Sequence, residues 1–179
     1  ELYQITIDRL NEILKSFNIN NFDWSKNLIC TDTLAFDNFD NKFDIVIGNP
    51  PYVNIHNIDD RDLVKTYNFA IKGMTDLYIC FFEKGLKMLN SDGTLCFITP
   101  NSYFNSKAAF EMRKYIVDKK LLTRIYNFGH VQVFENATTY SCITMLSKKN
   151  NSGCFEYTDH KTGKTKILHY TSVFINNIL

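Results

Sequence analysis

The sequence predicts an α/β fold built on a mostly parallel sheet with an antiparallel hairpin at its edge. Short apolar runs alternate with amphipathic segments of helical period over residues 1–150, which is the pattern of βαβ units. The last two strand-like runs follow one another with no helical pattern between them, which indicates a hairpin. We therefore expect a core over residues 1–150 and an edge hairpin within residues 151–179.

Each expected element follows from the spacing of its apolar residues. Apolar side chains recur every three or four positions in three segments, which predicts helices over 8–17, 76–90 and 107–120. Continuous or alternating apolar runs predict strands over 27–32, 43–48, 93–100, 122–129, 140–149, 154–159 and 166–171. The opening residues 2–8 are also compatible with a strand.

Composition excludes several classes of protein. The chain has 179 residues, of which 45% are hydrophobic and 22% charged, typical of a globular domain and not of a disordered one. No apolar run reaches the roughly 20 residues of a membrane helix, and the net charge of +1 neither requires nor forbids a nucleic-acid partner. Five cysteines without a C-x-x-C pair indicate reduced thiols in a cytoplasmic protein. The four histidines lack the spacing of metal ligands, so we expect no metal site.

The residues Asn49-Pro50-Pro51-Tyr52, directly after the apolar run 43–48, are the strongest chemical signal. Each proline fixes its own φ, lacks an N–H donor and pushes the preceding residue towards extended geometry. The Asn49 side-chain oxygen and the Pro50 carbonyl can then converge as two acceptors, with the flat face of Tyr52 beside them. A stiff surface turn is the alternative, but ligands of such sheets bind at the carboxyl ends of strands.

Two convergent acceptors suit a planar NH₂ group. The lone pair of an aryl amine is delocalised into its ring, and hydrogen bonds from both N–H groups to fixed oxygens favour the pyramidal, nucleophilic form. The same oxygens stabilise the positive charge that develops on nitrogen. Tyr52 can stack on the ring, worth about 1–3 kcal/mol per base, and a base in a duplex has to flip out to reach such a pocket.

This motif in this context resembles the adenine-specific DNA methyltransferases of the gamma class, found in restriction–modification systems. Further similarity lies in Ile29–Leu34, in Asp76-Leu77-Tyr78 with the helix that follows, in Asp92–Pro100 and in Val133–Ala137. The resemblance implies a Rossmann-like methyltransferase fold, S-adenosylmethionine as cofactor and double-stranded DNA as partner. It assigns acceptor roles to Asn49 and Pro50, and it lets Pro51, Tyr52 and Phe134 contact the flipped base.

The resemblance also assigns the cofactor site. Asp32 and Thr33, together with Asn49, match the positions that hold the cofactor. The family's glycine-rich cofactor loop does not occur in this sequence, so we expect that loop and the first strand to lie upstream. A target-recognition domain is expected after the edge hairpin, and a restriction endonuclease or further segments of the same protein are possible partners.

Several single residues allow a structural interpretation as well. Asp32 could cap a turn at a strand end, Phe134 could belong to the core, and Asp76 is expected to cap the following helix. Five lysines occur late in the chain and form either a solvated face or a phosphate-contacting surface: Lys148, Lys149, Lys161, Lys164 and Lys166.

Two alternatives to DNA adenine methylation remain open. The same chemistry could act on a glutamine amide of a protein or on a guanine amine of RNA, because those enzymes share the Asn-Pro-Pro-Tyr/Phe motif. A catalytically silent subunit that binds DNA or a partner chain is the second alternative, and the missing glycine-rich loop is its main support.

Overall fold

The computed structural model describes residues 1–20, 22–58, 61–70, 75–135 and 139–170. They fall into two compact units, Glu1–Phe36 and Asp37–Leu179. The first unit consists of helix α1 (Leu2–Ser16) and a return segment that contains the short 3-10 helix η1 (Trp24–Lys26). The indole nitrogen of Trp24 donates to Asn11 over 2.8 Å, and the Tyr3 hydroxyl donates to the Leu28 carbonyl over 3.3 Å. The return segment therefore runs back along the helix.

Two expectations for this unit are wrong. Residues 2–8 are helical and not extended, because Leu2 and Ile5 continue the helical spacing of Leu10 and Ile13 towards the amino end. Residues 27–32 do not form a strand. A strand needs a neighbour for its backbone hydrogen bonds, and no described residue pairs with this segment.

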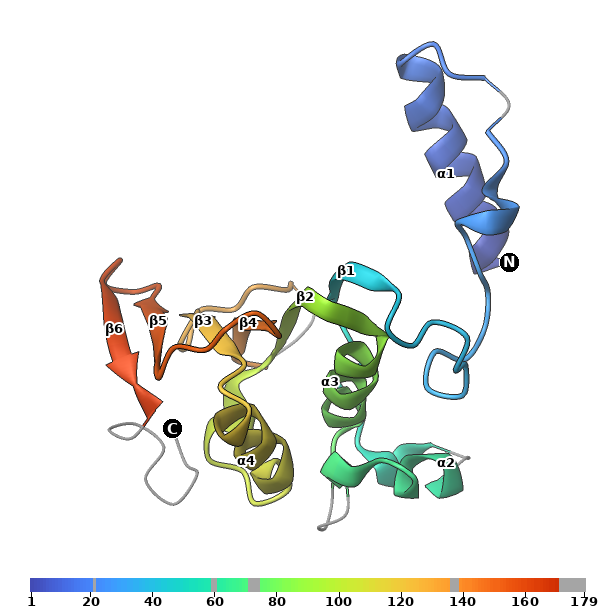
Figure 1. The fold of residues 1–179 in the computed structure, drawn as a ribbon. Coiled ribbons are helices and arrows are strands. Elements are labelled where there is room, and N and C mark those ends of the chain that lie inside the picture. The colour runs from blue at the N-terminus through green and yellow to red at the C-terminus, as the bar shows by residue number, and fades with distance from the viewer. Residues whose placement is uncertain (21, 59–60, 71–74, 136–138, 171–179) are drawn as a thin grey trace. The chain divides into compact units, whose positions relative to one another are not determined.

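The second unit is built on one sheet, which has six strands in the described residues (Figure 1). They are β1 (Phe43–Gly48), β2 (Leu89–Pro100), β3 (Leu122–Asn127), β4 (Ser141–Ser147), β5 (Cys154–Asp159) and β6 (Thr165–His169), in the order β1-β2-β4-β3-β5-β6. The pairings β1–β2 and β3–β5 are parallel, and β4 and β6 are antiparallel to their neighbours. Four strands thus share one direction, and the predicted hairpin is confirmed as β5–β6 at the sheet edge.

The polar residues between the expected helix 76–90 and the expected strand 93–100 lie inside β2. Phe43 pairs with Leu89 and Ile45 pairs with Thr94, so four residues of β2 stand opposite one residue of β1. The Asp92 amide donates to the Asn90 side chain within this irregularity. Helix α3 still ends at Met88, close to the predicted position.

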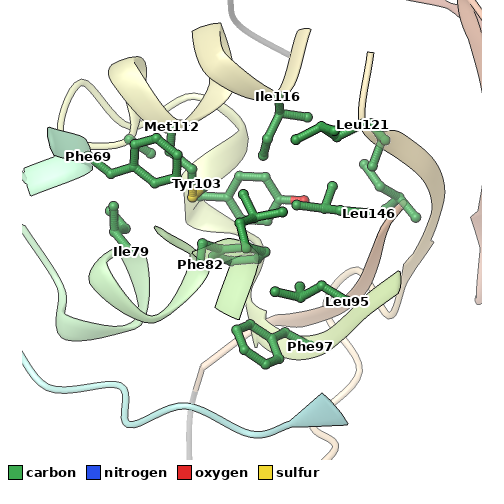
Figure 2. Packing of buried hydrophobic residues seen from close by; sticks show 14 of the residues in the cluster. Phe69, Ile79, Phe82, Leu95, Phe97, Tyr103, Met112, Ile116, Leu121 and Leu146 are labelled. Atoms are coloured by element: carbon green, nitrogen blue, oxygen red, sulfur yellow. The ribbon is translucent and has the colours of Figure 1, made fainter. Parts of the chain in front are cut away.

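Helices α3 (Leu77–Met88) and α4 (Phe110–Asp118) cover one face of the sheet, as Figure 1 shows, and the short α2 (Arg61–Lys65) lies beside α3. The core lies between these helices and β2, β3 and β4. In Figure 2 the Tyr103 ring occupies its centre, surrounded by Phe82, Ile116 and Leu146. The Tyr103 hydroxyl is satisfied by Thr144 at 2.7 Å. The four co-directional strands therefore have their carboxyl ends at the same end of the sheet.

None of the helices in the described parts of the chain combines the length and apolar character needed to cross a bilayer.

Candidate active site

The corner Asn49-Pro50-Pro51-Tyr52 is held at both of its ends. Before it, Gly48 is the last β1 residue in register with β2, opposite Phe97. After it, the Leu77 amide donates to the Val53 carbonyl over 2.8 Å. The Ile55 amide also donates to the Thr75 carbonyl over 3.0 Å. The corner therefore spans from the sheet to the start of α3, and neither end can shift without breaking backbone hydrogen bonds.

The Tyr52 side chain provides a third attachment. Its hydroxyl donates to the Ile98 carbonyl on β2 over 3.0 Å, and its ring meets the buried Tyr78 ring edge-on at a centroid distance of 6.4 Å. Burial raises the pKa of Tyr52 above its ordinary value. The hydroxyl therefore stays protonated at neutral pH and fixes the ring in place, leaving the aromatic face as the part that can contact a ligand.

The two predicted acceptors are not used by the surrounding protein. Asn49 is exposed and Pro50 is buried. Among the described residues, neither the Asn49 side chain nor the Pro50 carbonyl takes part in a hydrogen bond. A rigid corner with two uncommitted oxygens has the chemistry that recognition of an NH₂ group requires.

Asp32 and Thr33 lie in the first unit, in a turn. The Asp32 Oδ1 atom accepts a hydrogen bond from the Leu34 amide over 2.9 Å, and both Asp32 and Thr33 are exposed. The turn-capping interpretation is thus correct for one carboxylate oxygen. Oδ2 makes no hydrogen bond to any described residue, so an exocyclic amine could still be held there.

Phe134 lies in the segment after β3 and is half-buried. The Gln132 side chain donates to the carbonyls of Phe134 and Glu135 over 2.9 and 3.0 Å, which fixes the backbone at this point. Phe134 is not a member of the buried hydrophobic cluster. Asn136 and Ala137 of the same motif, and residues 171–179 of the expected hairpin region, lie outside the described residues.

A polar network lies at the same end of the sheet. Asn101 Nδ2, just after β2, donates to Asn127 Oδ1 over 3.1 Å, and Asn127 Nδ2 donates to the Tyr157 hydroxyl over 2.7 Å. The Gly129 amide also donates to Asn127 Oδ1. Asparagines at the ends of two strands were a visible signal, but only the sheet order shows that β2, β3 and β5 supply neighbouring partners.

Two sequence interpretations are changed by the structure. Asp76 stands at the N-cap position of α3 but makes no capping hydrogen bond; its carboxylate accepts from Asn54 Nδ2 over 3.2 Å. The late lysines do not form one cluster. Lys148 and Lys149 follow β4 and lie at the amino ends of β1, β2, β3 and β5, whereas the β5–β6 turn lies at their carboxyl ends. Lys148 donates to the Leu89 carbonyl there.

A cleft of about 400 Å³ lies near Lys148, at the amino ends of the co-directional strands, and none of the predicted site residues lines it. Its walls are Asp40, Asn41, Asn68, Phe69, Glu83, Leu86, Lys87, Tyr115 and Lys148. Buried Glu83 is already satisfied there by Asn68, the Phe69 amide and Lys87. The cleft is therefore separate from the corner at Asn49.

Solved structures share this fold. A class I S-adenosylmethionine-dependent methyltransferase of Listeria monocytogenes matches with a TM-score of 0.56 and 21% identity over 70% of this chain and 39% of its own. The type IIG restriction endonuclease BpuSI matches with a TM-score of 0.61 and 14% identity over 80% of this chain and 21% of its own. The chain has the Rossmann-like fold of class I methyltransferases.

Sequence comparison gives the family. The type II restriction enzyme and methyltransferase RM.Eco57I of Escherichia coli is 33% identical over 73% of this chain and 14% of its own length. The type II methyltransferase M.BstVI of Geobacillus stearothermophilus is 31% identical over 84% of this chain and 28% of its own. The chain thus spans less than a third of either relative. The model of the Eco57I restriction-modification methylases matches residues 2–134, and the chain belongs to that family.

Proposed function

We propose that this chain contributes the amine-binding corner of an enzyme that transfers a methyl group from S-adenosylmethionine to the exocyclic amine of adenine in DNA. The observation that carries the proposal is the corner itself: Asn49 and Pro50 offer two uncommitted oxygens on a turn held by β2 and α3. Membership of a family of restriction-modification methylases supports DNA as the substrate.

The chain's residues fit the proposed cofactor. Asp32 Oδ2 is an exposed acceptor suited to an adenine amino group, and Thr33 adds a hydroxyl next to it. When bound, S-adenosylmethionine supplies an electrophilic methyl group on a sulfonium. The fold shared with a class I S-adenosylmethionine-dependent methyltransferase supports this choice of cofactor.

The corner prepares the amine for alkylation in two ways. Asn49 Oδ1 and the Pro50 carbonyl accept its two N–H bonds, which turns the nitrogen lone pair away from the aromatic ring. The same oxygens stabilise the positive charge on nitrogen as the new N–C bond forms, a preorganised electrostatic effect. The backbone that carries both residues is fixed at the two ends of the corner, which helps to orient the amine for attack.

The base itself is held by aromatic faces. The Tyr52 ring, fixed by its hydroxyl and by Tyr78, presents one face, and Phe134 is proposed to contact the base from the other side, with Pro51 at the rim. Such a base has to leave the duplex, because its exocyclic amine is not accessible to a rigid corner inside the stack. An aromatic residue at position 134 favours adenine in DNA over a protein amide or an RNA guanine.

Partners are proposed on the names of the relatives. The Escherichia coli relative is both a restriction enzyme and a methyltransferase, so we infer an endonuclease activity in the same protein or in a partner. Residues 151–179 are proposed to lead from the catalytic core into a target-recognition domain. A catalytically silent subunit is the second candidate, and it differs from the enzyme in not binding S-adenosylmethionine.

The test is Asn49→Ala in the full protein, assayed by incorporation of labelled methyl groups into duplex DNA. Loss of one preorganised hydrogen-bond partner costs about 10²–10³ in kcat, so we expect at least a hundredfold loss with an unchanged thermal transition. Asn151→Ala is the matched control, because Asn151 is exposed and lies before β5 at the other end of the sheet.

The results separate the candidates. Full methyl transfer by Asn49→Ala would remove the role of the corner. Transfer into a protein or RNA acceptor but not into DNA would favour the alternative substrates. Calorimetry with S-adenosylmethionine decides the silent subunit: no binding heat at high cofactor concentration would favour it.

A further inference from the structure

The turn between β5 and β6 lies at the same edge of the sheet as the amine-binding corner. β1, β2, β3 and β5 run in one direction, so their carboxyl ends meet there. β5 is four strands from β1 in the sheet order. At a strand spacing of about 4.8 Å, the turn is about 19 Å from the corner along the edge, which corresponds to about five or six base-pair steps of B-DNA.

The turn is a fixed structure and not a loose connection. Asp159 Oδ1 accepts from both the amide and the hydroxyl of Thr162, over 2.8 and 2.9 Å. These hydrogen bonds hold the pKa of Asp159 below its ordinary value. The Asp159 amide donates to the Lys164 carbonyl over 3.0 Å, and Gly163 supplies the positive φ of 64° that closes the turn.

A cluster of three rings supports the turn from the β3 side. The Tyr126 hydroxyl lies 2.9 Å from His160 Nδ1, and Phe128 contacts both rings at centroid distances of 5.1 and 5.4 Å. The His160 amide donates to the Asn127 carbonyl over 2.9 Å. The position of the turn relative to the Asn101–Asn127 network at the sheet edge is therefore determined.

The side chains that this turn presents are basic. Lys161, Lys164 and Lys166 are exposed, and within the described residues none of them forms an ion pair. The nearby carboxylate of Glu156 is paired with Arg124, and that of Asp159 is engaged inside the turn. A rigid basic turn flanked by the half-buried rings of Tyr126 and Phe128 has the character of a phosphate-contacting surface, whereas protein interfaces are depleted in lysine.

We propose that the β5–β6 turn, through Lys161 and Lys164, contacts the phosphate backbone of duplex DNA about five or six base pairs from the flipped base. This inference rests on the proposed function, because it takes DNA at the corner as its starting point. The contact adds affinity that does not depend on sequence, and it does not touch the reacting atoms.

The test uses the full protein with both lysines replaced, Lys161→Gln/Lys164→Gln, and a mixed-sequence 30-base-pair duplex. Binding is followed by fluorescence anisotropy over a range of salt concentrations. Each neutralised phosphate contributes about 0.9 to the slope of log K against log salt, so the slope should fall by about 1–2. In methyl-transfer assays the KM for DNA should rise while kcat stays unchanged, because the corner is intact.

The charge-matched control is Lys42→Gln/Lys149→Gln, since both residues are exposed and lie at the opposite edge of the sheet. It should keep the parent slope. If the parent methylates DNA and the turn variant has the slope of this control, the contact does not exist and the proposed function stands. If the parent binds and methylates no DNA, the proposed function fails and this inference fails with it.

Discussion

At the scale of single residues, the proposed site combines a fixed aromatic ring with two oxygens to which no described residue donates a hydrogen bond. The Tyr52 hydroxyl donates to the Ile98 carbonyl, and the aromatic face is the part of the side chain that we propose contacts the base. The roles of the hydroxyl and of the aromatic face can be tested separately, because phenylalanine keeps the face and removes only the hydroxyl.

We predict that Tyr52→Phe keeps methyl transfer within a few-fold of the parent and lowers stability by about 1 kcal/mol, the net contribution of one hydrogen bond. Tyr52→Ala removes the stacking face, worth about 1–3 kcal/mol per base, so the KM for DNA should rise roughly ten- to hundredfold. Steady-state kinetics and thermal unfolding of both variants measure these effects. Equal losses in the two variants would mean that the hydroxyl has a chemical role.

The corner could be predicted from the sequence because its rigidity is local: two consecutive prolines after an apolar run determine it. Its attachments could not, because Ile98 and Leu77 are 46 and 25 positions from Tyr52 and are brought to it only by the sheet and α3. The sequence predicted that Asp76 caps its own helix, but its carboxylate accepts from Asn54 instead. Asn54 is also distant in the sequence, so this partner could not be predicted.

At the scale of elements, helical period and apolar runs predicted most of the second unit. One exception is the irregular stretch of β2 at residues 90–93, whose polar sequence is absorbed into the strand opposite β1; another is the short helix α2, which was not predicted. In the first unit, residues 27–32 have the composition of a strand but no partner among the described residues. Strand formation depends on a neighbour, and a single segment's composition does not reveal one.

The packing of α3 on β2 gives an element-scale prediction. A Cβ atom at Gly85 would lie 2.5 Å from Leu95 Cδ1 and 3.1 Å from Phe97 Cζ, in a fully buried part of the core. We predict that Gly85→Val destabilises the protein by about 1–3 kcal/mol, because overpacking forces these side chains to move. Urea denaturation measures the change, with Gly153→Ala as control, since nothing lies within 4 Å of a Cβ there.

A Gly85→Val variant as stable as the parent would contradict this close approach of α3 to the sheet. The control should change stability by less than about 0.5 kcal/mol. Since the start of α3 also holds the residue after Tyr52 in place, the variant should lose methyl transfer at lower temperatures than the parent.

At the scale of the whole molecule, the apolar surface of the sheet is unevenly covered. Val46 packs against the core under α3, whereas Ile45 and Ile47 on the same strand are 66% and 77% exposed. The apolar run at 43–48 therefore has one face buried within the unit Asp37–Leu179. Its other face is not covered by the described residues of that unit.

The buried thiols of this unit make its stability depend on alkaline pH. Burial raises the pKa of Cys80 to about 12 and that of Cys142 to about 11, from an ordinary value of 9.0. Between about pH 9 and pH 11, the thiols of the unfolded chain lose protons that the same thiols of the folded protein keep. The stabilisation from the neutral thiols is thus fully present below about pH 9, and it decreases as the pH rises towards 11–12.

We predict that the free energy of unfolding falls by roughly 2–3 kcal/mol between pH 8 and pH 10, since each thiol contributes about 1.4 kcal/mol per pH unit while only its unfolded form ionises. Urea titrations at the two pH values, with a phosphine reductant present, measure the change. Cys80→Ala and Cys142→Ala should each reduce this pH dependence by about 1.4 kcal/mol, the contribution of one thiol, whatever they do to stability at pH 8. Cys30→Ala, at an exposed position, should leave it unchanged; equal stability of the parent at both pH values would show that the two thiols are reached by water.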